Sequence, residues 1–422
     1  MSNPVKLAVL GAGARGRGYS TFAASYPEKL QIYAVAEPDD RRREYMAKTY
    51  NIPAERCFKT WQEFCQQPKM CDGVIISTQD EMHEAPAVAC ANLKYHILLE
   101  KPMAPTAEAC RNIVNAVKAN GVMFAVCHVL RYTKYTRALK EIIQSGEIGE
   151  VVSIQHLEPV GYWHQAHSFV RGNWRNEEES SFMLLAKCCH DIDWLHTVMD
   201  KKCTSIQSFG SLRHFKKSEQ PAGAADRCCD CPKEVESLCP YSAYKIYFSD
   251  RFSKGNTGWP TDVLTNSEPV TKENLSAALK EGPYGRCVYA CDNDVVDNQT
   301  VNMLFDDGAT ASMTMTAFTR HAGRFTRIFG TRGEIYTDSN IIKVFNFLTD
   351  TERVVDTNIV NDGGILSGHG GGDFGLMYAF TEALANQDQS KILSGIDETL
   401  SSHLMVFAAE DSRKTGKVIN MD

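Results

Sequence analysis

Three glycines near the start of the chain have the spacing of a phosphate-binding loop. Gly11, Gly13 and Gly16 follow an apolar run over residues 5–10 and open an Ala-rich segment that favours a helix. In such a loop the first glycine permits the tight turn, the second lets the backbone approach a pyrophosphate, and the third lets helix and strand pack closely. The helix N-terminus then faces the phosphates. This pattern predicts a dinucleotide-binding site.

Glu37 supports the same interpretation from the end of the second apolar run, over residues 30–36. A carboxylate about 20 residues beyond the glycine loop is placed to accept hydrogen bonds from a ribose. It would repel a 2′-phosphate, so we expect NAD rather than NADP. The basic run Arg41 to Arg43 leaves NADP open, although it also suits the solvated first turn of a helix.

Two later segments mix aromatic rings with hydrogen-bonding side chains, as sugar sites do. Flat rings cover the C–H patches of a sugar, and forked donors bind its hydroxyls or anionic groups. The alternative is an exposed loop that covers a sheet. The predicted substrate contacts in these segments are Tyr162, His164, His167, Arg171, Trp174 and Arg175.

His369 and Asp373 enclose a further glycine-rich stretch, directly before a predicted helix. Glycines let the backbone approach a ligand closely, so both side chains are candidate substrate contacts. Asp373 also has the residue type of a helix N-cap, and the two roles are compatible.

The cysteines suggest a metal site in a polar part of the chain. Cys228, Cys231 and Cys239 form a C-x2-C-x7-C pattern, and Cys287 or Cys291 would complete a tetrahedral zinc site, with Cys287 preferred. Such a zinc would be structural, because four thiolates leave no open position for a substrate. The alternative is a set of reduced cysteines without a metal.

Composition excludes several classes of partner. The 422 residues are 43% hydrophobic and 23% charged, with a net charge of −7, which is ordinary for a globular protein of two domains. No long Lys/Arg block is present, so nucleic acid is not an expected partner. We see no signal peptide and no apolar run of membrane-spanning length. The fifteen cysteines then predict reduced thiols in a cytoplasmic protein.

Strands and helices alternate through residues 1–130, which predicts an α/β fold with a doubly wound parallel sheet, the Rossmann domain that binds NAD. Strands are expected at 5–10, 30–36, 72–78, 95–99 and 122–126, and helices at 39–50, 82–91 and 106–119.

The pattern changes in residues 131–422, for which we predict an α+β domain with a large, mainly antiparallel sheet. This domain would bind the substrate and support oligomerisation. A Cys-rich and Pro-rich stretch, about 215–285, reads as an insertion. Expected strands are 151–157, 205–212, 301–305, 310–316 and 324–329, with a hairpin turn at 306–308 and closing helices near 374–385 and 397–415.

Four motifs along the chain resemble the Gfo/Idh/MocA oxidoreductases, the superfamily of glucose–fructose oxidoreductase and inositol dehydrogenase. The resemblance covers nearly the whole chain, and its most specific motif is Glu100-Lys101-Pro102. It implies a homo-oligomer joined through the C-terminal sheet. The other motifs are Ser77-Thr78 with His83, the run Lys187 to Asp193, and the final segment Ala408 to Gly416.

The resemblance also implies which residues do the chemistry. Hydride transfer from a sugar hydroxyl to nicotinamide needs a base for the hydroxyl proton. Lys101 is one candidate, with a pKa depressed by burial or by the neighbouring cation Lys187; His190 is another, because histidine titrates near neutrality. Lys187 itself is the third catalytic candidate. The expected cofactor contacts are Gly11, Gly13, Arg15, Gly16, Glu37, Thr78, His83, Glu100 and Lys101.

One position departs from the family. Many relatives carry aspartate four residues before the helix histidine, where this chain has Ala186. The usual Lys–Asp–His arrangement is therefore incomplete, and the identity of the proton acceptor is open. Asp191 or Asp193 could orient His190, or either could be an acid on the helix surface; Asp191 is also a candidate substrate contact.

We therefore expect an NAD-dependent oxidoreductase that acts on a hydroxyl of a sugar, glycoside or cyclitol. An alternative is an NAD-dependent glycosidase, which oxidises a ring carbon transiently, eliminates the aglycone, adds water and reduces the ring again. A third class is a non-catalytic NAD-binding regulator. Net NADH formation, aglycone release without net NADH, and absence of turnover distinguish the three.

Overall fold

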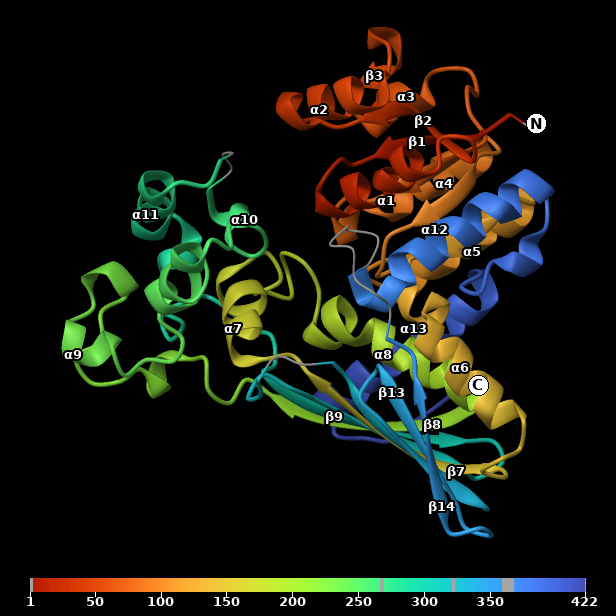
Figure 1. Ribbon diagram of the computed structural model, residues 1–422. Coiled ribbons are helices and arrows are strands. Elements are labelled where there is room, and N and C mark those ends of the chain that lie inside the picture. The colour runs from red at the N-terminus through yellow and green to blue at the C-terminus, as the bar shows by residue number, and fades with distance from the viewer. Residues whose placement is uncertain (1–2, 266–268, 321–322, 359–367, 422) are drawn as a thin grey trace.

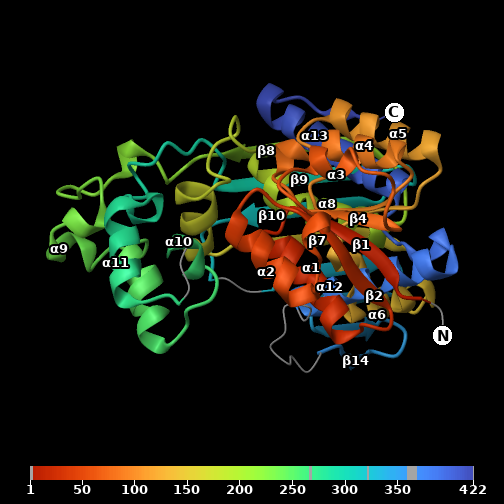
Figure 2. The same cartoon turned by 90° about the horizontal axis from the view of Figure 1, so that it is seen from above.

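The structure is a computed structural model that describes residues 3–265, 269–320, 323–358 and 368–421. Two sheets organise it, and a third body of short helices projects from the second sheet (Figures 1 and 2). In the described parts of the chain, no helix combines the length and the apolar character needed to cross a membrane.

The first sheet has six strands that all pair in parallel, as predicted for a Rossmann domain. Buried apolar side chains cover both faces of its central strands. In spatial order the strands are β3 (Cys57–Phe58), β2 (Leu30–Ala36), β1 (Val5–Leu10), β4 (Gly73–Ile76), β5 (His96–Leu99) and β6 (Phe124–Val126). The helices between them are α1 (Ala14–Ser25), α2 (Asp40–Tyr50), α3 (Trp61–Cys65), α4 (Glu84–Asn92) and α5 (Ala107–Asn120).

The strand order places a ligand-binding crevice at the carboxyl ends of β1 and β4. From β1 the chain proceeds outward to β2 and β3, and it then crosses back to β4 on the other side of β1. In open α/β sheets ligands bind where the order reverses in this way. The glycine loop follows β1, and the segment from Ser77 follows β4, so both lie at this switch point.

The second sheet has nine strands and is mainly antiparallel, as predicted; the pair β7–β10 is parallel. The turn after Phe305 closes the predicted hairpin, with the Gly308 N–H donating to the Phe305 carbonyl at 3.0 Å. In spatial order the strands are β14 (Thr351–Asp356), β13 (Ile341–Asn346), β12 (Gly333–Thr337), β11 (Phe325–Gly330), β7 (Val151–Pro159), β10 (Thr310–Thr316), β9 (Asn298–Phe305), β8 (Cys203–Ser211) and β15 (Ile419–Asn420).

Helices cover the face of this sheet that looks toward the first domain (Figure 1). They are α6 (Lys134–Gln144), α8 (Met183–Met199) and α13 (Ile396–Thr415), and α12 (Gly368–Asn386) contacts α6 from the side of the first domain. α8 and α13 pack on the sheet, whereas α12 packs on α1 and β1 of the first domain. Leu376, Met377 and Phe380 of α12 share one hydrophobic core with Val9 and Phe22.

The projecting body is formed by the chain between β8 and β9, where the sequence predicts an insertion. Its own core includes Tyr247, Leu275 and Leu279, together with Ala166 and Val170 from the segment that follows β7. That segment consists of α7 (Tyr162–His164) and the π-helical η4 (Gln165–Arg171). The insertion contains α9 (Lys233–Glu236), η7 (Tyr244–Ser249), η8 (Phe252–Lys254), α10 (Asp262–Thr265) and α11 (Lys272–Glu281).

Candidate active site

The three glycines of the loop after β1 have different surroundings. A Cβ on Gly11, where φ is +92°, would lie 2.7 Å from the Ser77 carbonyl oxygen, and a Cβ on Gly16 would lie 2.1 Å from the Gly11 carbonyl oxygen. A Cβ on Gly13 would meet nothing within 4 Å. Gly11 and Gly16 are therefore required by packing. Gly13 leaves open space over the N-terminus of α1, which no side chain caps, as a pyrophosphate needs.

Glu37 closes the other side of this loop. Its buried carboxylate accepts hydrogen bonds from the Ala12 N–H at 2.6 Å and from the Asp39 N–H at 3.0 Å. The side chain therefore lies beside the glycine loop at the end of β2, where the adenosine ribose of a dinucleotide is bound in this fold.

The turn after β4 is fixed to the turn after β5 by His83. Its Nδ1 lies 2.8 Å from the Pro102 carbonyl oxygen, and its Nε2 lies 3.2 Å from the Thr78 carbonyl oxygen. The Thr78 hydroxyl donates to the Met82 carbonyl at 3.2 Å. His83 thus positions the Glu100-Lys101-Pro102 turn, in which the Lys101–Pro102 peptide is cis.

Glu100 joins the two domains through Arg15. The Glu100 carboxylate accepts hydrogen bonds from Arg15 Nε at 2.5 Å, the Tyr19 hydroxyl at 2.8 Å and the Lys101 N–H at 2.5 Å. Burial alone would raise the pKa of Glu100, but Arg15 and Lys101 outweigh it, and this pKa lies below its usual value. Arg15 Nη2 also pairs with Asp373 of α12 at 2.5 Å.

His369 extends this chain of charges toward the cleft. Its Nδ1 lies 2.9 Å from Asp373, and its ring centre lies 5.8 Å from that of His190. Asp373 is buried and His369 is partly exposed. Arg15, predicted as a cofactor contact, therefore orients Asp373, and Asp373 in turn orients His369.

Lys101 reaches from the first domain to α8. Its Nζ donates a 2.8 Å hydrogen bond to the carbonyl of Ala186, the position at which the sequence departs from the motif that it resembles. Because Ala186 lies one helical turn before His190, this contact brings the Lys101 ammonium and the His190 imidazole to the same part of the cleft.

His190 is buried, and its Nδ1 has no hydrogen-bond partner among the described residues. Burial first, then the nearby Lys101, lowers the pKa of His190 well below its usual value. The prediction that His190 titrates near neutrality is therefore wrong. The ring is neutral at physiological pH and presents a lone pair rather than a charge.

Lys187 and Asp191 of α8 belong to a largely enclosed ion cluster that joins this helix to β7 and to Arg324, just before β11. Lys187 pairs with Glu158 at 3.0 Å, and Glu158 pairs with Arg324 at 3.1 Å. Arg324 also pairs with Asp191, whose Oδ1 lies 3.0 Å from Nε2 of His156. The charge of Lys187, invoked from sequence to depress the pKa of Lys101, is thus already balanced by Glu158.

Asp193 is also buried, so the alternative that these acids lie on the helix surface is wrong. Arg131 binds its carboxylate with two hydrogen bonds of 2.7 Å, and Ser402 adds a third at 2.8 Å. Burial alone would raise the pKa of Asp193, but Arg131 and His128 have the larger combined effect, so this pKa lies below its usual value. This pair ties η3 (Val129–Tyr132), at the end of the first domain, to α8.

Asp80 is a candidate that the sequence did not single out. It follows β4, its Oδ2 is buried without a hydrogen-bond partner among the described residues, and the Trp174 side chain donates a hydrogen bond to its carboxylate. Burial raises the pKa of Asp80, while His83 and Lys101 oppose that shift. The signal available in the sequence was an acidic residue between Thr78 and His83, directly after an apolar run at the expected carboxyl end of a strand.

The predicted substrate contacts in the aromatic segments divide into two groups: rings that form a row toward Asp80, and side chains that bind the insertion. The ring of His164 lies 5.9 Å from Phe169, and Phe169 lies 6.3 Å from Trp174. These rings form a row along η4 (Gln165–Arg171), and Trp174 at one end of the row hydrogen-bonds to Asp80. Tyr162 and Lys245 of the insertion share a hydrogen bond. His167 is buried in the insertion, with Nδ1 2.9 Å from the Tyr247 hydroxyl.

Both arginines of these segments bind the insertion. Arg171 is buried and donates to the carbonyls of Arg286 at 2.7 Å and Tyr241 at 2.8 Å. Arg175 forms two 2.9 Å hydrogen bonds with Asp292. The substrate contact predicted for Arg171 is wrong for this structure, because its guanidinium is enclosed by protein; Arg171 anchors the insertion instead.

The predicted zinc ligands Cys228, Cys231, Cys239 and Cys287 line one small cavity of about 20 Å³. Even so, no group of three or more His, Cys, Asp or Glu side chains in the described residues is arranged to hold a metal ion. The zinc prediction is therefore not supported. All fifteen cysteines are free thiols.

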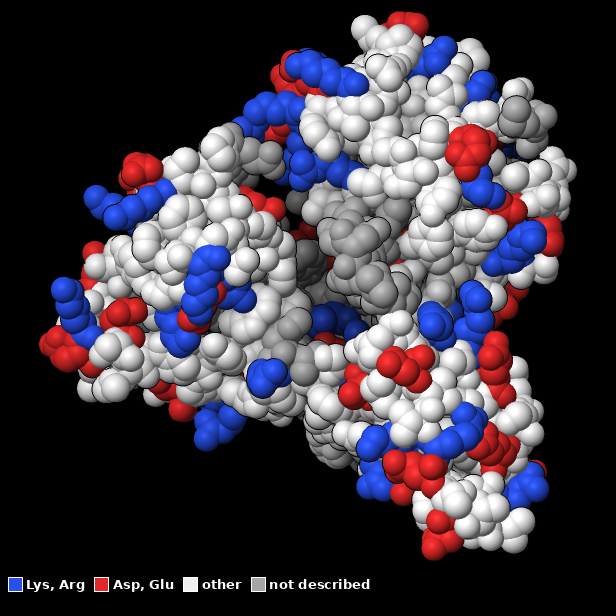
Figure 3. Space-filling view, viewed as in Figure 1, with Lys and Arg blue, Asp and Glu red and all other residues white. Residues whose placement is uncertain are grey.

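The surface is hollowed between the insertion and the first domain (Figure 3). Together with the glycine loop at the strand ends, this arrangement defines a two-domain, dinucleotide-binding protein. The sequence signature of an oxidoreductase family with an NAD-binding Rossmann fold matches residues 5–128, and the signature of that family's C-terminal alpha/beta domain matches residues 140–421. The chain belongs to this Gfo/Idh/MocA oxidoreductase family and carries its NAD-binding domain, as the motifs indicated.

Individual relatives are distant. The protein YteT of Bacillus subtilis is 23% identical over 86% of this chain and 85% of its own length. An inositol 2-dehydrogenase/D-chiro-inositol 3-dehydrogenase of Lacticaseibacillus casei is 28% identical, over 48% of this chain and 55% of its own length. Among solved structures, a levoglucosan dehydrogenase in complex with NADH and L-sorbose aligns over the full length of both chains with a TM-score of 0.72 at 17% identity. These likenesses show the family and the fold.

Proposed function

We propose that this protein is an NAD-dependent dehydrogenase that oxidises a hydroxyl of a sugar, glycoside or cyclitol. The observation that carries the proposal is the hydrogen bond from Lys101 to Ala186, which brings a cation and a neutral histidine together at the strand ends. The named activity of the inositol dehydrogenase relative supports the substrate class.

The residues present fit the cofactor. The open space over Gly13, the uncapped N-terminus of α1 and the carboxylate of Glu37 match a pyrophosphate and a ribose. When bound, NAD supplies the hydride acceptor. The protein must then remove the hydroxyl proton and stabilise negative charge on the oxygen.

The two site residues suit different parts of that task. Neutral His190 has a lone pair that accepts the hydroxyl proton. Because its pKa is low, the proton must then move to a stronger base, and His369, which pairs with Asp373 and has its ring centre 5.8 Å from that of His190, is placed to take it. Lys101 donates a hydrogen bond to the oxygen on which charge develops. Asp80, in the neighbouring turn after β4, is close enough to Lys101 for their charges to interact, and it offers a carboxylate in place of the aspartate absent at Ala186.

A parallel screen tests this function. Sugars, cyclitols and 4-nitrophenyl glycosides are incubated with NAD, and NADH absorbance and nitrophenol release are read together. Net NADH formation is expected. Nitrophenol release without net NADH would instead establish the glycosidase route, and no turnover with tight NAD binding would establish a regulator.

We infer a preference for NAD over NADP from Glu37. Its carboxylate is held by the Ala12 and Asp39 amides beside the loop, so a 2′-phosphate there would meet a fixed negative charge. Titration of both cofactors by tryptophan fluorescence should show tighter binding of NAD. Tighter binding of NADP would overturn this inference and would favour a role for Arg41 to Arg43.

We also infer that copies associate through the outer face of the nine-stranded sheet. Phe209, Leu304, Tyr336 and Val354 are each more than 40% exposed on the face opposite the helices. An apolar surface of this kind on a sheet is typical of an interface. Sedimentation should show a dimer or larger assembly, and Tyr336→Lys should weaken it. Leu348→Lys, at a fully exposed turn, is the control.

The free thiols support a reducing compartment such as the cytoplasm, because secreted proteins rich in cysteine usually form disulfides. Fractionation of the expressing cell tests this inference.

A further inference from the structure

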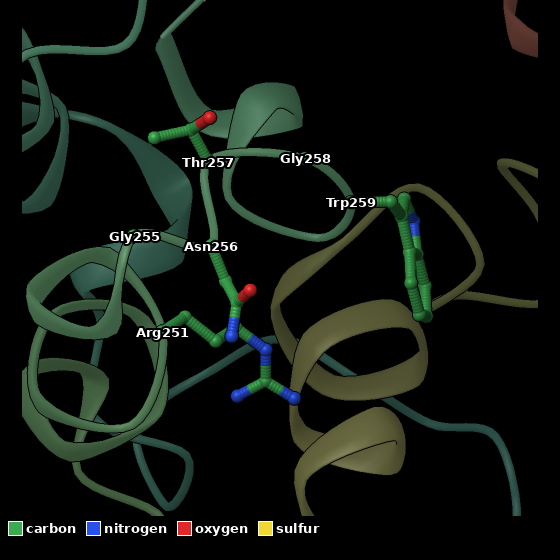
Figure 4. A pocket seen from close by; sticks show the side chains of 6 residues that line it. All are labelled: Arg251, Gly255, Asn256, Thr257, Gly258 and Trp259. Carbon is green, nitrogen blue, oxygen red and sulfur yellow. The ribbon is translucent and has the colours of Figure 1, made fainter. Parts of the chain in front are cut away.

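The insertion carries a cavity that the chemistry described above does not use. It has a volume of about 390 Å³, within the ordinary range for a small-molecule pocket of roughly 300–1,000 Å³. The loop between η8 and α10 forms most of its wall (Figure 4). Its lining residues are Arg251, Gly255, Asn256, Thr257, Gly258 and Trp259.

The lining has the chemistry of a carbohydrate subsite. Trp259 is 52% exposed and supplies a flat apolar face, while Asn256 and Thr257 are exposed and supply an amide and a hydroxyl. No carboxylate is among the lining residues, and Arg251 adds a forked donor. Such a combination suits the C–H face and the hydroxyl groups of a neutral sugar ring.

The two large side chains are held in place. The Arg251 guanidinium lies 4.0 Å from the ring centre of Trp163 and donates to the Ile246 carbonyl at 2.7 Å. Trp259 lies 5.1 Å from His164 and 5.5 Å from Trp163, measured between ring centres. Little conformational entropy is therefore lost when a ligand stacks on this tryptophan.

A continuous row of rings connects this pocket with Lys101. From Trp259 the row passes through His164 and Phe169 to Trp174, with ring centres between 5.1 and 6.3 Å apart. Trp174 donates a hydrogen bond to Asp80, which is close enough to Lys101 for their charges to interact.

We propose that the insertion binds a second ring of the substrate, so that the protein acts on a glycoside or oligosaccharide of at least two rings. The placement of the reacting ring near Lys101 rests on the proposed function. The placement of the second ring rests on the pocket and its aromatic row. Trp259 is the stacking platform, and Asn256 and Thr257 bind hydroxyl groups.

The test compares short and extended probes. Steady-state kinetics with NAD use glucose against cellobiose, maltose and 4-nitrophenyl glucosides. Trp259→Ala should raise KM for the extended probes by about tenfold or more, the loss expected for one aromatic stacking contact. The KM for glucose should be the same in Trp259→Ala as in the wild-type protein. Leu238→Ala removes an exposed apolar side chain elsewhere in the insertion and is the matched control.

Calorimetric titration of the same probes into the NADH-bound protein separates this inference from the proposed function. If no sugar is oxidised but cellobiose or a nitrophenyl glucoside binds and Trp259→Ala weakens that binding, the proposed function fails and the subsite stands. If glucose and the extended probes are oxidised with the same KM in both proteins, the subsite is overturned. Absence of binding of every extended probe to the wild-type protein also overturns it.

Discussion

The cleft has two walls of opposite character. The wall formed by the first domain and α8 is built from ion pairs that hold one another: Glu100 with Arg15, Arg15 with Asp373, and Asp193 with Arg131. The wall formed by the insertion and the segment after β7 contains a row of aromatic rings, in which Trp259 of the insertion is half exposed. A charged framework fixes the positions of reacting groups, whereas stacking surfaces tolerate different sugars. We therefore propose that the first wall carries the chemistry and that the second wall selects the substrate.

The largest expected effect tests the charged wall. Lys101→Ala and His190→Ala should each lower kcat by roughly 10²–10⁴, because general acid–base catalysis usually contributes that much. NAD affinity should change little, since the glycine loop and Glu37 carry it. Stopped-flow turnover and fluorescence titration measure the two quantities. Lys118→Ala, a partly exposed lysine on α5, is the control, and near-normal turnover of both variants would place the chemistry elsewhere.

The glycine loop allows a comparison within the first wall. Gly16→Ala should lower the free energy of unfolding by about 2–3 kcal/mol, because its Cβ would overlap the Gly11 carbonyl oxygen. Gly13→Ala should cost less than about 1 kcal/mol, because its Cβ meets open space. It should nevertheless weaken NAD binding by occupying the approach to the pyrophosphate. Denaturant unfolding and NAD titration check both; equal stability losses would contradict the assignment.

Asp80 tests whether a carboxylate of the first domain replaces the one absent at Ala186. Asp80→Asn should lower kcat about 10- to 100-fold, at the weaker end of general acid–base effects. Burial raises the pKa of Asp80, so its ionised form, and with it the activity, is lost as pH falls through that raised pKa. The variant should therefore lose the acid limb of its kcat/KM profile. An unchanged profile with lower stability would show that the role is structural.

The smallest effect concerns the insertion wall. Burial lowers the pKa of His167 to about 3, whereas an unfolded histidine titrates near 6.5. Below pH 6.5 this histidine binds a proton in the unfolded state but not in the folded state. The free energy of unfolding therefore decreases as the pH is lowered from 6.5 toward 3. One such group costs about 2 kcal/mol between pH 6.5 and pH 5. His167→Gln should lower stability at pH 7 but flatten its pH dependence by that amount, as measured by urea unfolding.

The strands of both sheets were predictable to different degrees. The run over residues 310–316 coincides with β10 because alternation and turn residues bound it clearly. β12, β13 and β14 were not predicted. All of β14 is at least partly exposed at the sheet edge, so its sequence lacks the alternation of a half-buried strand. The π-helical η4 was not predicted, and an exposed loop was the alternative considered for its segment, because its polar and aromatic residues show no helical period.

The candidate site also contains features that the sequence predicted and features that it did not. The glycine loop and the Glu100-Lys101-Pro102 turn are local motifs, so sequence located them. The pairing of Asp191 with Arg324 joins residues 133 positions apart and follows from the sheet, so sequence gave no sign of it. The neutrality of His190 and the enclosure of Arg171 depend on burial, which residue type alone does not determine.

Helix α12 has a consequence for how the chain folds. It lies late in the sequence, yet Leu376, Met377 and Phe380 fill the core under the first sheet. Each of these side chains contributes about 1.5–3 kcal/mol to stability when it is buried. Separating the domains would expose their apolar surface and would therefore cost several kcal/mol of folding free energy. Residues 1–130 alone would leave that surface open to aggregation. The two domains are therefore one cooperative unit, and the Rossmann core is complete only after the last fifth of the chain has been synthesised.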